Sequence, residues 1–295
     1  MRRQFWLIAA ALMAAPSVAL ADCQPSFVST SNLVEIRTPS LDEPQVSDRF
    51  FVEVRNSGED ACTLRLAVGR DMAASRPGFP SFSLSGPTGM VPASALPASP
   101  TDTDPRTAIV IQVPANGSVR VPYDVSFNVN WGMASGDYEQ ELIYQLYEGE
   151  GGQEELGSQR TRLSLNIPAV ARVRFSGASG GDGPAQLAMG ALSATSQTHS
   201  PPFAIRVLST SAYRIELVSQ NHGALLRTNG PDRIPYRLLL DGEVLDLRGA
   251  GDFATEGGHT SATGKVHPLR VVIDPDPTRH AGTYSDRVTI TITTL

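Results

Sequence analysis

Apolar and polar residues alternate with a period of two along most of this chain, and this pattern constrains the fold more than any other feature. Period two places successive side chains on opposite faces of a β-strand. The pattern predicts strands at residues 27–36, 50–55, 62–66, 108–113, 119–121, 138–147, 160–167, 171–175, 203–208, 213–218, 234–240, 266–273 and 288–292. No stretch of useful length has the 3.6-residue period of a helix. We therefore expect an all-β protein.

Turn-forming residues separate the predicted strands and suggest two domains. The chain has 26 glycines and 22 prolines, and the Asn116-Gly117 pair is the strongest hairpin signal among them. The strand pattern stops near Pro168 and restarts at Val170. Domains of residues 22–168 and 169–295 would each be close to the commonest domain size. We predict two tandem antiparallel immunoglobulin-like β-sandwiches.

Residues 1–21 have the three parts of a secretory signal peptide. Arg2 and Arg3 precede an apolar run at residues 5–15, and the small residues Ala19 and Ala21 suit the cleaving peptidase. The run is too short for a membrane span. Asp22 disfavours a lipid-anchored Cys23, because a lipoprotein signal needs a small residue there. We expect an exported protein that begins at residue 22 after cleavage.

Cys23 and Cys62 are the only cysteines, and both belong to the exported part. In an oxidising compartment two cysteines favour a disulfide. A mixed Cys/His zinc site is disfavoured because the first half of the chain has no histidine. We expect a Cys23–Cys62 disulfide that ties the start of the mature chain into the first domain.

Composition and motifs give no support for nucleic-acid binding or catalysis. The net charge of −6 disfavours binding to phosphate backbones. Residues 177–181 match a nucleophile elbow by letters, but Gly183 and Pro184 disfavour the helix that must follow. The five histidines lack metal-ligand spacing, and we assign them to surface and loop positions. We expect no enzyme activity, no cofactor and no metal.

The last predicted strand alternates strictly. Val288, Ile290 and Ile292 share one face, and threonines occupy the other. The apolar face of such a strand has to be covered. Alternation alone favours ordinary core residues of a complete sandwich. The alternative is a sandwich that borrows a strand from another chain by strand addition at an open edge.

Residues 281–292 (Ala-Gly-Thr-Tyr-Ser-Asp-Arg-Val-Thr-Ile-Thr-Ile) resemble the closing motif of the spore coat protein U-like domain, the pilin module of archaic chaperone-usher pili. Its motif residues here are Ala281, Gly282, Tyr284 and Asp286. Residues 213–219, followed by Gly223, and residues 234–238 resemble the domain's central strands. The resemblance covers about residues 168–295. It departs from the family in two ways, because this half has no cysteine and its last residue is Leu295 rather than an aromatic residue.

The resemblance implies that the second sandwich lacks its closing strand. A periplasmic assembly chaperone would supply a strand first, and the N-terminal extension of an adjacent pilin subunit would supply it later. The accepting edge would comprise Val288, Ile290, Ile292 and Leu295.

The resemblance also implies a position in the fibre. With Cys23 held in the first domain, the chain would accept a strand without donating one. Two domains with the pilin-like module second is the layout of tip adhesins, which pass through an outer-membrane usher to the cell surface. The rival hypothesis is a self-contained periplasmic or extracellular β-sandwich protein with a binding or scaffold role.

Two stretches are candidates for contact with a surface or glycan ligand. Residues 76–106 form a long stretch rich in Pro, Ser and Gly, and long loops are often functional. Phe79, Phe82, Leu84 and Met90 give it apolar surface. The alternative is that residues 82–84 form another strand of the core. Trp131, in a second loop, is a candidate for stacking on a sugar or for packing in the core.

Overall fold

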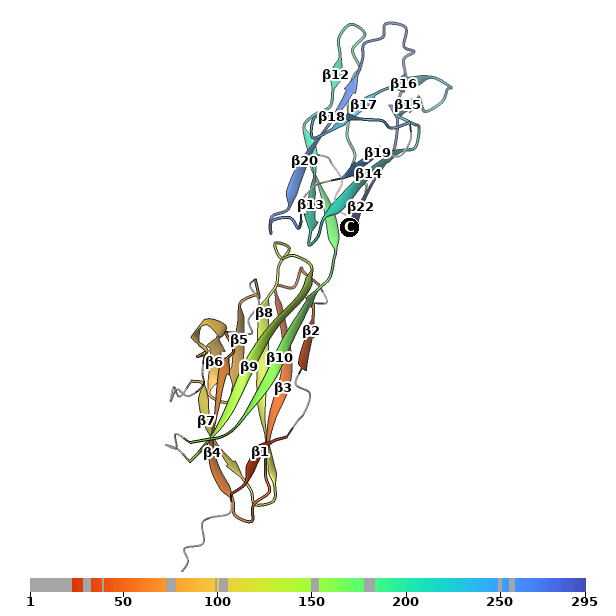
Figure 1. Cartoon of the computed structure of the whole chain (residues 1–295). Helices are drawn as coiled ribbons and strands as arrows, with labels where there is room; N and C mark the ends of the chain where they lie inside the picture. The colour runs from red at the N-terminus through yellow and green to blue at the C-terminus, as the bar shows by residue number, and fades with distance from the viewer. Residues whose placement is uncertain are drawn as a thin grey trace, which may run out of the picture.

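A computed structural model describes residues 23–28, 33–38, 40–72, 78–98, 100, 106–149, 154–177, 184–248, 251–254 and 258–295. Over these residues the chain is all-β, as predicted, with one short 3₁₀ helix, η1 (Ala93–Ala95). Figure 1 displays two β-sandwiches arranged end to end. No helix in this described part is long and apolar enough to cross a membrane. The predicted signal peptide, residues 1–21, lies outside the described residues.

The first sandwich consists of two five-stranded sheets. One sheet has the strand order β1-β3-β8-β5-β6, and the other has the order β2-β10-β9-β4-β7. The strands are β1 (Pro25–Phe27), β2 (Leu33–Arg37), β3 (Gln45–Asn56), β4 (Cys62–Arg70), β5 (Phe82–Gly86), β6 (Gly89–Pro92), β7 (Ala108–Val113), β8 (Ser118–Asn128), β9 (Gly136–Glu148) and β10 (Glu155–Ile167).

The first predicted strand, residues 27–36, is two strands in the structure. β1 pairs with β3 in one sheet, whereas β2 pairs with β10 in the other. The polar residues 29–32 interrupt the apolar alternation between them. β2 also runs parallel to β10, so this pairing differs from an otherwise antiparallel sandwich. It covers the edge of β10 that faces away from β9.

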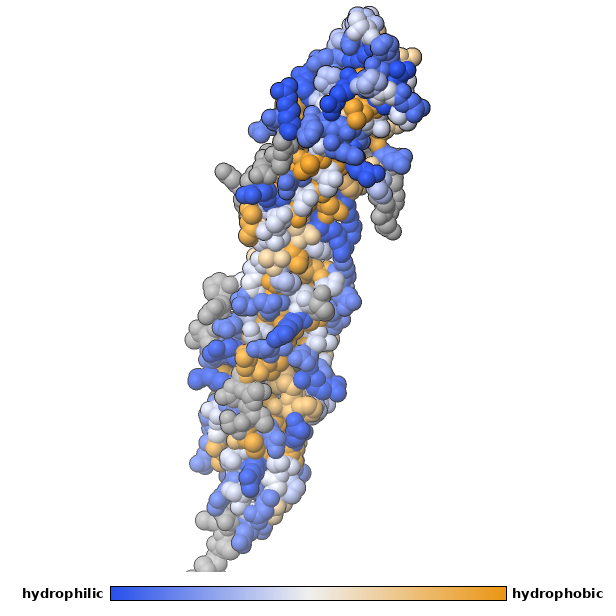
Figure 2. Space-filling view, turned by 90° about the vertical axis from the view of Figure 1, so that its right-hand side faces the viewer, coloured by the Kyte–Doolittle hydropathy of each residue, from blue (hydrophilic) through white to orange (hydrophobic). Residues whose placement is uncertain are grey.

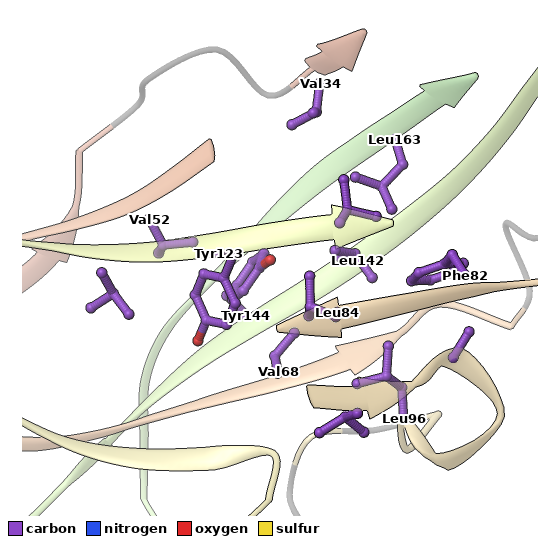
Figure 3. Packing of buried hydrophobic residues seen from close by; sticks show 14 of the residues in the cluster. Val34, Val52, Val68, Phe82, Leu84, Leu96, Tyr123, Leu142, Tyr144 and Leu163 are labelled. Carbon is purple, nitrogen blue, oxygen red and sulfur yellow. The ribbon is translucent and has the colours of Figure 1, made fainter. Parts of the chain in front are cut away.

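The core of the first sandwich is enclosed between its sheets. Val52, Leu142 and Leu163 are fully buried, and Figure 3 displays them around Tyr123 and Tyr144, whose ring centroids are 5.5 Å apart. Burying each such aliphatic side chain contributes about 1.5–3 kcal/mol. The first sandwich is thus stabilised by a continuous apolar core.

Part of the proposed ligand stretch belongs to this core. β5 pairs with β8, which places Phe82 opposite Phe127 and Leu84 opposite Val125. Both Phe82 and Leu84 are buried. The expectation that these two side chains lie on an exposed loop is therefore corrected, because their alternation fits a strand beside β8.

The second sandwich has a longer sheet, β11-β13-β20-β17-β18 with β12 beside β20, and two shorter ones, β19-β14-β22 and β16-β15-β21. The strands are β11 (Ala171–Ser176), β12 (Thr198–His199), β13 (Phe203–Ser209), β14 (Tyr213–Ser219), β15 (Ala224–Arg227), β16 (Arg233–Pro235), β17 (Arg237–Leu240), β18 (Glu243–Leu245), β19 (Gly251–Ala254), β20 (Lys265–Ile273), β21 (Tyr284–Ser285) and β22 (Val288–Thr294). The predicted strand 234–240 is divided after Pro235, which has no N–H to continue a ladder.

One histidine departs from the sequence prediction. His267 is fully buried rather than at the surface. Its Nδ1 lies 2.6 Å from the Asp241 carboxylate and its Nε2 lies 2.7 Å from the Tyr213 hydroxyl. A buried imidazole is tolerated when its nitrogens are hydrogen-bonded, and both nitrogens have partners here.

Candidate functional site

The edge of β22 is the most unusual feature of the second sandwich. On one side β22 pairs with β14, with Ile292 opposite Ile215 and Ile290 opposite Leu217. On its other side no strand pairs with it within the described ranges. Its outer row of backbone N–H and C=O groups therefore has no ladder partner there, as at any sheet edge.

The inward side chains of β22 are incompletely covered. Val288, Ile290 and Ile292 pack against the core of the second sandwich but are only partly buried. On β14, Ile215 and Leu217, the partners of Ile292 and Ile290, are fully buried. Paired residues of an antiparallel ladder point to the same face of the sheet. The difference in burial between β22 and β14 therefore arises because β22 has no strand on its outer side among the described residues, and not because the side chains point in different directions.

The opposite side of this opening is formed by β11, the first strand of the longer sheet. Phe175 is paired with Ile205, which is fully buried, so Phe175 also faces the interior. Its side chain is nevertheless 45% exposed. β11 comes within 8 Å of β22 between Cα atoms without pairing with it. We call these two edges, which do not pair with each other, together with their partly exposed inward side chains, the β11–β22 groove.

The first sandwich provides an internal comparison. A similar sequence spans the start of β9 (residues 134–138) and precedes β22 (residues 281–284). β9 lies between β4 and β10, so both its edges are paired. Leu163, Leu165 and Ile167 of β10 are fully buried. Among the residues described, β22 has no neighbour that corresponds to β10, the strand that pairs with β9 in the first sandwich.

A pocket of about 650 Å³ lies at the start of β22. One wall is the segment 187–194, and the other is the segment 276–286, which leads into β22. Its apolar lining includes Leu187, Met189, Leu192, Leu225, Ile234 and Tyr284. In Figure 2, which views the side of the molecule carrying β22, apolar surface gathers over the part of the second sandwich nearer the first. The lining also includes the polar side chains of Asp276, Arg279, His280 and Asp286.

Asp286 fixes the position at which β22 begins. Its carboxylate accepts hydrogen bonds of 2.6 Å from the hydroxyls of Ser219 and Tyr236 and of 3.1 Å from the backbone N–H of Asn221. Burial raises the pKa of Tyr236, and the hydrogen bond to Asp286 raises this pKa further. Asp286 thus joins the end of β14, the β16–β17 break and the start of β22.

The residues before Asp286 are tied to the β15–β16 hairpin. Arg227 donates to the carbonyl oxygen of Ala281 at 2.6 Å and to the Asp232 carboxylate at 2.8 Å. A Cβ at Gly282 would lie 2.6 Å from Nε of Arg227, so the absence of a side chain leaves room for the guanidinium. The Tyr284 hydroxyl donates to the carbonyl oxygen of His280 at 2.8 Å.

The other residues predicted for the accepting edge and the ligand loops lie in different places. Leu295 follows β22 with its side chain 62% exposed, and its backbone N–H donates to the carbonyl oxygen of Ala212 at 2.8 Å. Phe79 packs edge-on against the rings of Phe82 and Phe127. Met90, at 71% exposure, is the one of the five candidate ligand residues that is mostly exposed.

Trp131 lies at the junction of the two sandwiches. Its indole N–H donates to Asp42 at 3.3 Å, and Cζ of Arg172 in β11 is 5.5 Å from its ring centroid. It also packs against the first core. Because these contacts occupy the ring, the structure does not place it on a free loop for sugar stacking.

The predicted disulfide is confirmed. Cys23 and Cys62 are joined, with Cα atoms 5.5 Å apart and a sequence separation of 39. Cys62 is buried at the start of β4. Among the described residues there is no group of three or more side chains suited to hold a metal ion.

One half of the groove was not predicted from the sequence. Alternation identified the inward residues of β22, whereas Phe175 and the segment 187–194 had no predicted role. The alternation of Val173 and Phe175 was the available signal, but the exposure of Phe175 depends on which strands lie beside β11.

No family model and no curated protein sequence matches this chain. Several solved structures match this chain at low sequence identity. The CsuC–CsuE chaperone–tip adhesion subunit complex from archaic chaperone-usher Csu pili of Acinetobacter baumannii shares 14% identity, covering 90% of this chain and 99% of that chain at a TM-score of 0.45. A mutant of the CFA/I adhesin CfaE of enterotoxigenic E. coli shares 11% identity, covering 90% and 93% at a TM-score of 0.40. The N-terminal domain of PorA shares 14% identity, covering 46% and 89% at a TM-score of 0.30.

Proposed function

We propose that this protein is an exported fimbrial subunit of an archaic chaperone-usher pilus whose second domain, residues 169–295, accepts a strand from another chain. The observation that carries the proposal is the β11–β22 groove. Its two edge strands approach without pairing, and inward side chains on both remain partly exposed. An extended segment with alternating apolar residues would complete the ladder of β22 and cover these side chains.

The proposed partners follow from this mode of binding. A periplasmic assembly chaperone and the N-terminal extension of an adjacent pilin would occupy the groove in turn, and an outer-membrane usher would exchange them. The resemblance of residues 281–292 to the closing motif of pilin modules supports this assignment. The contacts of Asp286 and Gly282 support it too, because they give the motif residues a role in holding the start of β22.

We propose the tip of the fibre as the position of this subunit, after removal of a signal peptide at residues 1–21. Cys23 is joined to Cys62, and β1 pairs with β3, so residues 23–27 are engaged in the first sandwich and are not available to a neighbour. The first domain, residues 22–168, would contact a surface or glycan. Met90, next to the exposed turn of the β5–β6 hairpin, is the candidate contact that remains.

The alternative is a self-contained β-sandwich protein with a binding or scaffold role. The observation in its favour is that Ile205, Ile215 and Leu217 are fully buried without any added strand.

A variant that carries its own covering strand distinguishes the strand-accepting subunit from the self-contained protein. Residues 149–167, the connection and strand that follow β9, are appended after Leu295 so that a copy of β10 can fold beside β22. A control carries serine at the three positions that copy Leu163, Leu165 and Ile167. We expect the first addition to raise the midpoint of thermal unfolding by several degrees and the control to leave it unchanged. Equal midpoints for both variants and the parent, with a monomeric and cooperatively unfolding parent, would favour the self-contained protein.

A further inference from the structure

Strand β11 connects the groove to the first sandwich. Val173 and Phe175 face the groove, and Arg172 lies on the opposite face because successive residues of a strand alternate. Arg172 donates two hydrogen bonds to the carboxylate of Asp42, at 2.7 Å from Nη1 and 2.5 Å from Nη2. Asp42 belongs to the segment before β3 in the first sandwich. One side of the groove is therefore held by a residue of the other sandwich.

Trp131 completes this contact. The same Asp42 oxygen that accepts from Nη1 of Arg172 accepts the indole N–H of Trp131, and the guanidinium of Arg172 lies over the indole ring. A cation over an aromatic face is attracted to it, and a paired carboxylate fixes the orientation of the guanidinium. We call these three residues the junction cluster.

The residue before β11 is fixed from the same side. The backbone N–H of Val170 donates to Oγ1 of Thr210 at 3.0 Å, and the N–H of Thr210 donates back to the carbonyl of Val170 at 3.1 Å. The carbonyl of Thr210 in turn accepts from the backbone N–H of Ser135 at 2.6 Å. Ser135 lies in the β8–β9 loop of the first sandwich. Two independent contacts from the first sandwich, one made directly to Arg172 and one made through Thr210, thus hold the start of β11.

We propose that Asp42 and Trp131 are positioning residues for the groove, which hold β11 where an incoming strand can bind between it and β22. This inference rests on the proposed function. A binding surface that is already ordered loses less conformational entropy on binding, so affinity is higher. Thermodynamic linkage makes the effect reciprocal, so a strand in the groove also restricts the motion of one sandwich relative to the other.

The test uses the full mature chain and a synthetic peptide of residues 155–167, the sequence of β10, as the probe. Its affinity is measured for the parent, Asp42→Asn, Arg172→Gln and the double variant. Trp131→Leu provides a second, uncharged perturbation of the cluster. Asp124→Asn is the matched control, because Asp124 accepts two hydrogen bonds from Arg49 (2.7 and 3.0 Å) in an exposed pair within the first sandwich. Spin labels, one on each sandwich, report the spread of distances between them.

We expect Asp42→Asn to weaken peptide binding about two- to fivefold, the range that exposed ion pairs give. The double variant should bind the peptide no more weakly than the weaker-binding of the two single variants, because Asp42→Asn and Arg172→Gln remove the same contact. The peptide should narrow the distance distribution in the parent and less in Asp42→Asn. Asp124→Asn should change neither readout.

Two results would overturn the inference in distinguishable ways. If the parent binds the peptide and Asp42→Asn and Trp131→Leu bind it equally well, the positioning role is wrong and the proposed function stands. If the parent does not bind the peptide and the variant with an appended β10 copy gains no stability, the proposed function fails and the inference fails with it.

Discussion

Phe175 and Ile205 lie directly opposite each other in the β11–β13 ladder, yet Ile205 is fully buried while nearly half of the Phe175 side chain is exposed. Both face the interior of the second sandwich. The difference is that β11 is an edge strand and β13 is flanked by β11 and β20. The energetic consequences of this uncovered edge can be measured directly.

The inward residues of β22 should contribute less to stability than those of β10. We expect Leu165→Ala to reduce the free energy of unfolding by about 2–5 kcal/mol, because Leu165 is fully buried. Ile292→Ala should cost less than half as much, because part of its side chain already contacts solvent. Urea unfolding monitored by circular dichroism measures both. Equal costs would mean that the β22 face is covered in solution.

Asp286 should be essential for the stability of the second sandwich. Asp286→Ala leaves the hydroxyls of Ser219 and Tyr236 without their acceptor, and we expect a loss of about 3 kcal/mol. Asp276→Ala is the control, because Asp276 accepts hydrogen bonds only within its own exposed turn, from Thr278. Similar losses for the two variants would argue against a joining role for Asp286.

Gly282 should tolerate no side chain while Arg227 keeps its position. We expect Gly282→Ala to destabilise by about 1 kcal/mol, since its Cβ would meet Nε of Arg227. Gly258→Ala is the control, because nothing lies within 4 Å of a Cβ at that position. Adding Arg227→Ala to Gly282→Ala should remove the steric part of the cost, which a thermal melt of the double variant will reveal.

The disulfide should stabilise the first sandwich. Replacing Cys23 and Cys62 together by alanine should lower the free energy of unfolding by about 3–4 kcal/mol for a loop of this length. Denaturant unfolding with and without a reducing agent measures the effect. The alanine variant should be insensitive to the reductant, and a parent equally insensitive would indicate that the bridge contributes nothing.

Two carboxylates should make the protein acid-sensitive. The hydrogen bonds from Arg172 hold the pKa of Asp42 below its usual value of 3.8, and those from Arg227 and His280 do the same for Asp232. A pKa lowered by folding contributes stability above the usual value and loses it as pH falls through the folded pKa. We therefore expect the midpoint temperature of thermal unfolding to fall as the pH is lowered below 3.8.

The acid-sensitivity prediction has its own controls. In Asp42→Asn and Asp232→Asn the drop should be smaller, and the midpoints of parent and variants should converge at the lowest pH. Midpoints that fall in parallel in all three proteins would contradict a role for these carboxylates.

Much of the fold was predictable because alternation is a local property of sequence. It located most strands, including β22, and the two cysteines of the chain had only each other as partners. Phe82 and Leu84 carried the same alternating signal, but a stretch rich in proline and glycine concealed it. What alternation cannot give is the identity of a strand's neighbours.

That limit explains the remaining differences. Residues 27–36 divide between two sheets, and β2 runs parallel to β10, because long-range pairing decides both. His267 is buried because Tyr213 and Asp241, distant in sequence, supply its hydrogen bonds. Trp131 lies at the junction because Arg172 and Asp42 meet there. Each depends on contacts between residues far apart along the chain.

The course of β22 has a mechanical consequence. The strand runs along the second sandwich toward the junction, and the C-terminal residue lies close to the first sandwich (Figure 1). Consider a segment from another chain that is hydrogen-bonded along β22. A pulling force along the long axis of the molecule would load these backbone hydrogen bonds in shear, so that many of them would resist the force at the same time. A force perpendicular to the strands would instead break the same hydrogen bonds one after another. The added segment should therefore resist detachment best when the force acts along the long axis of the molecule.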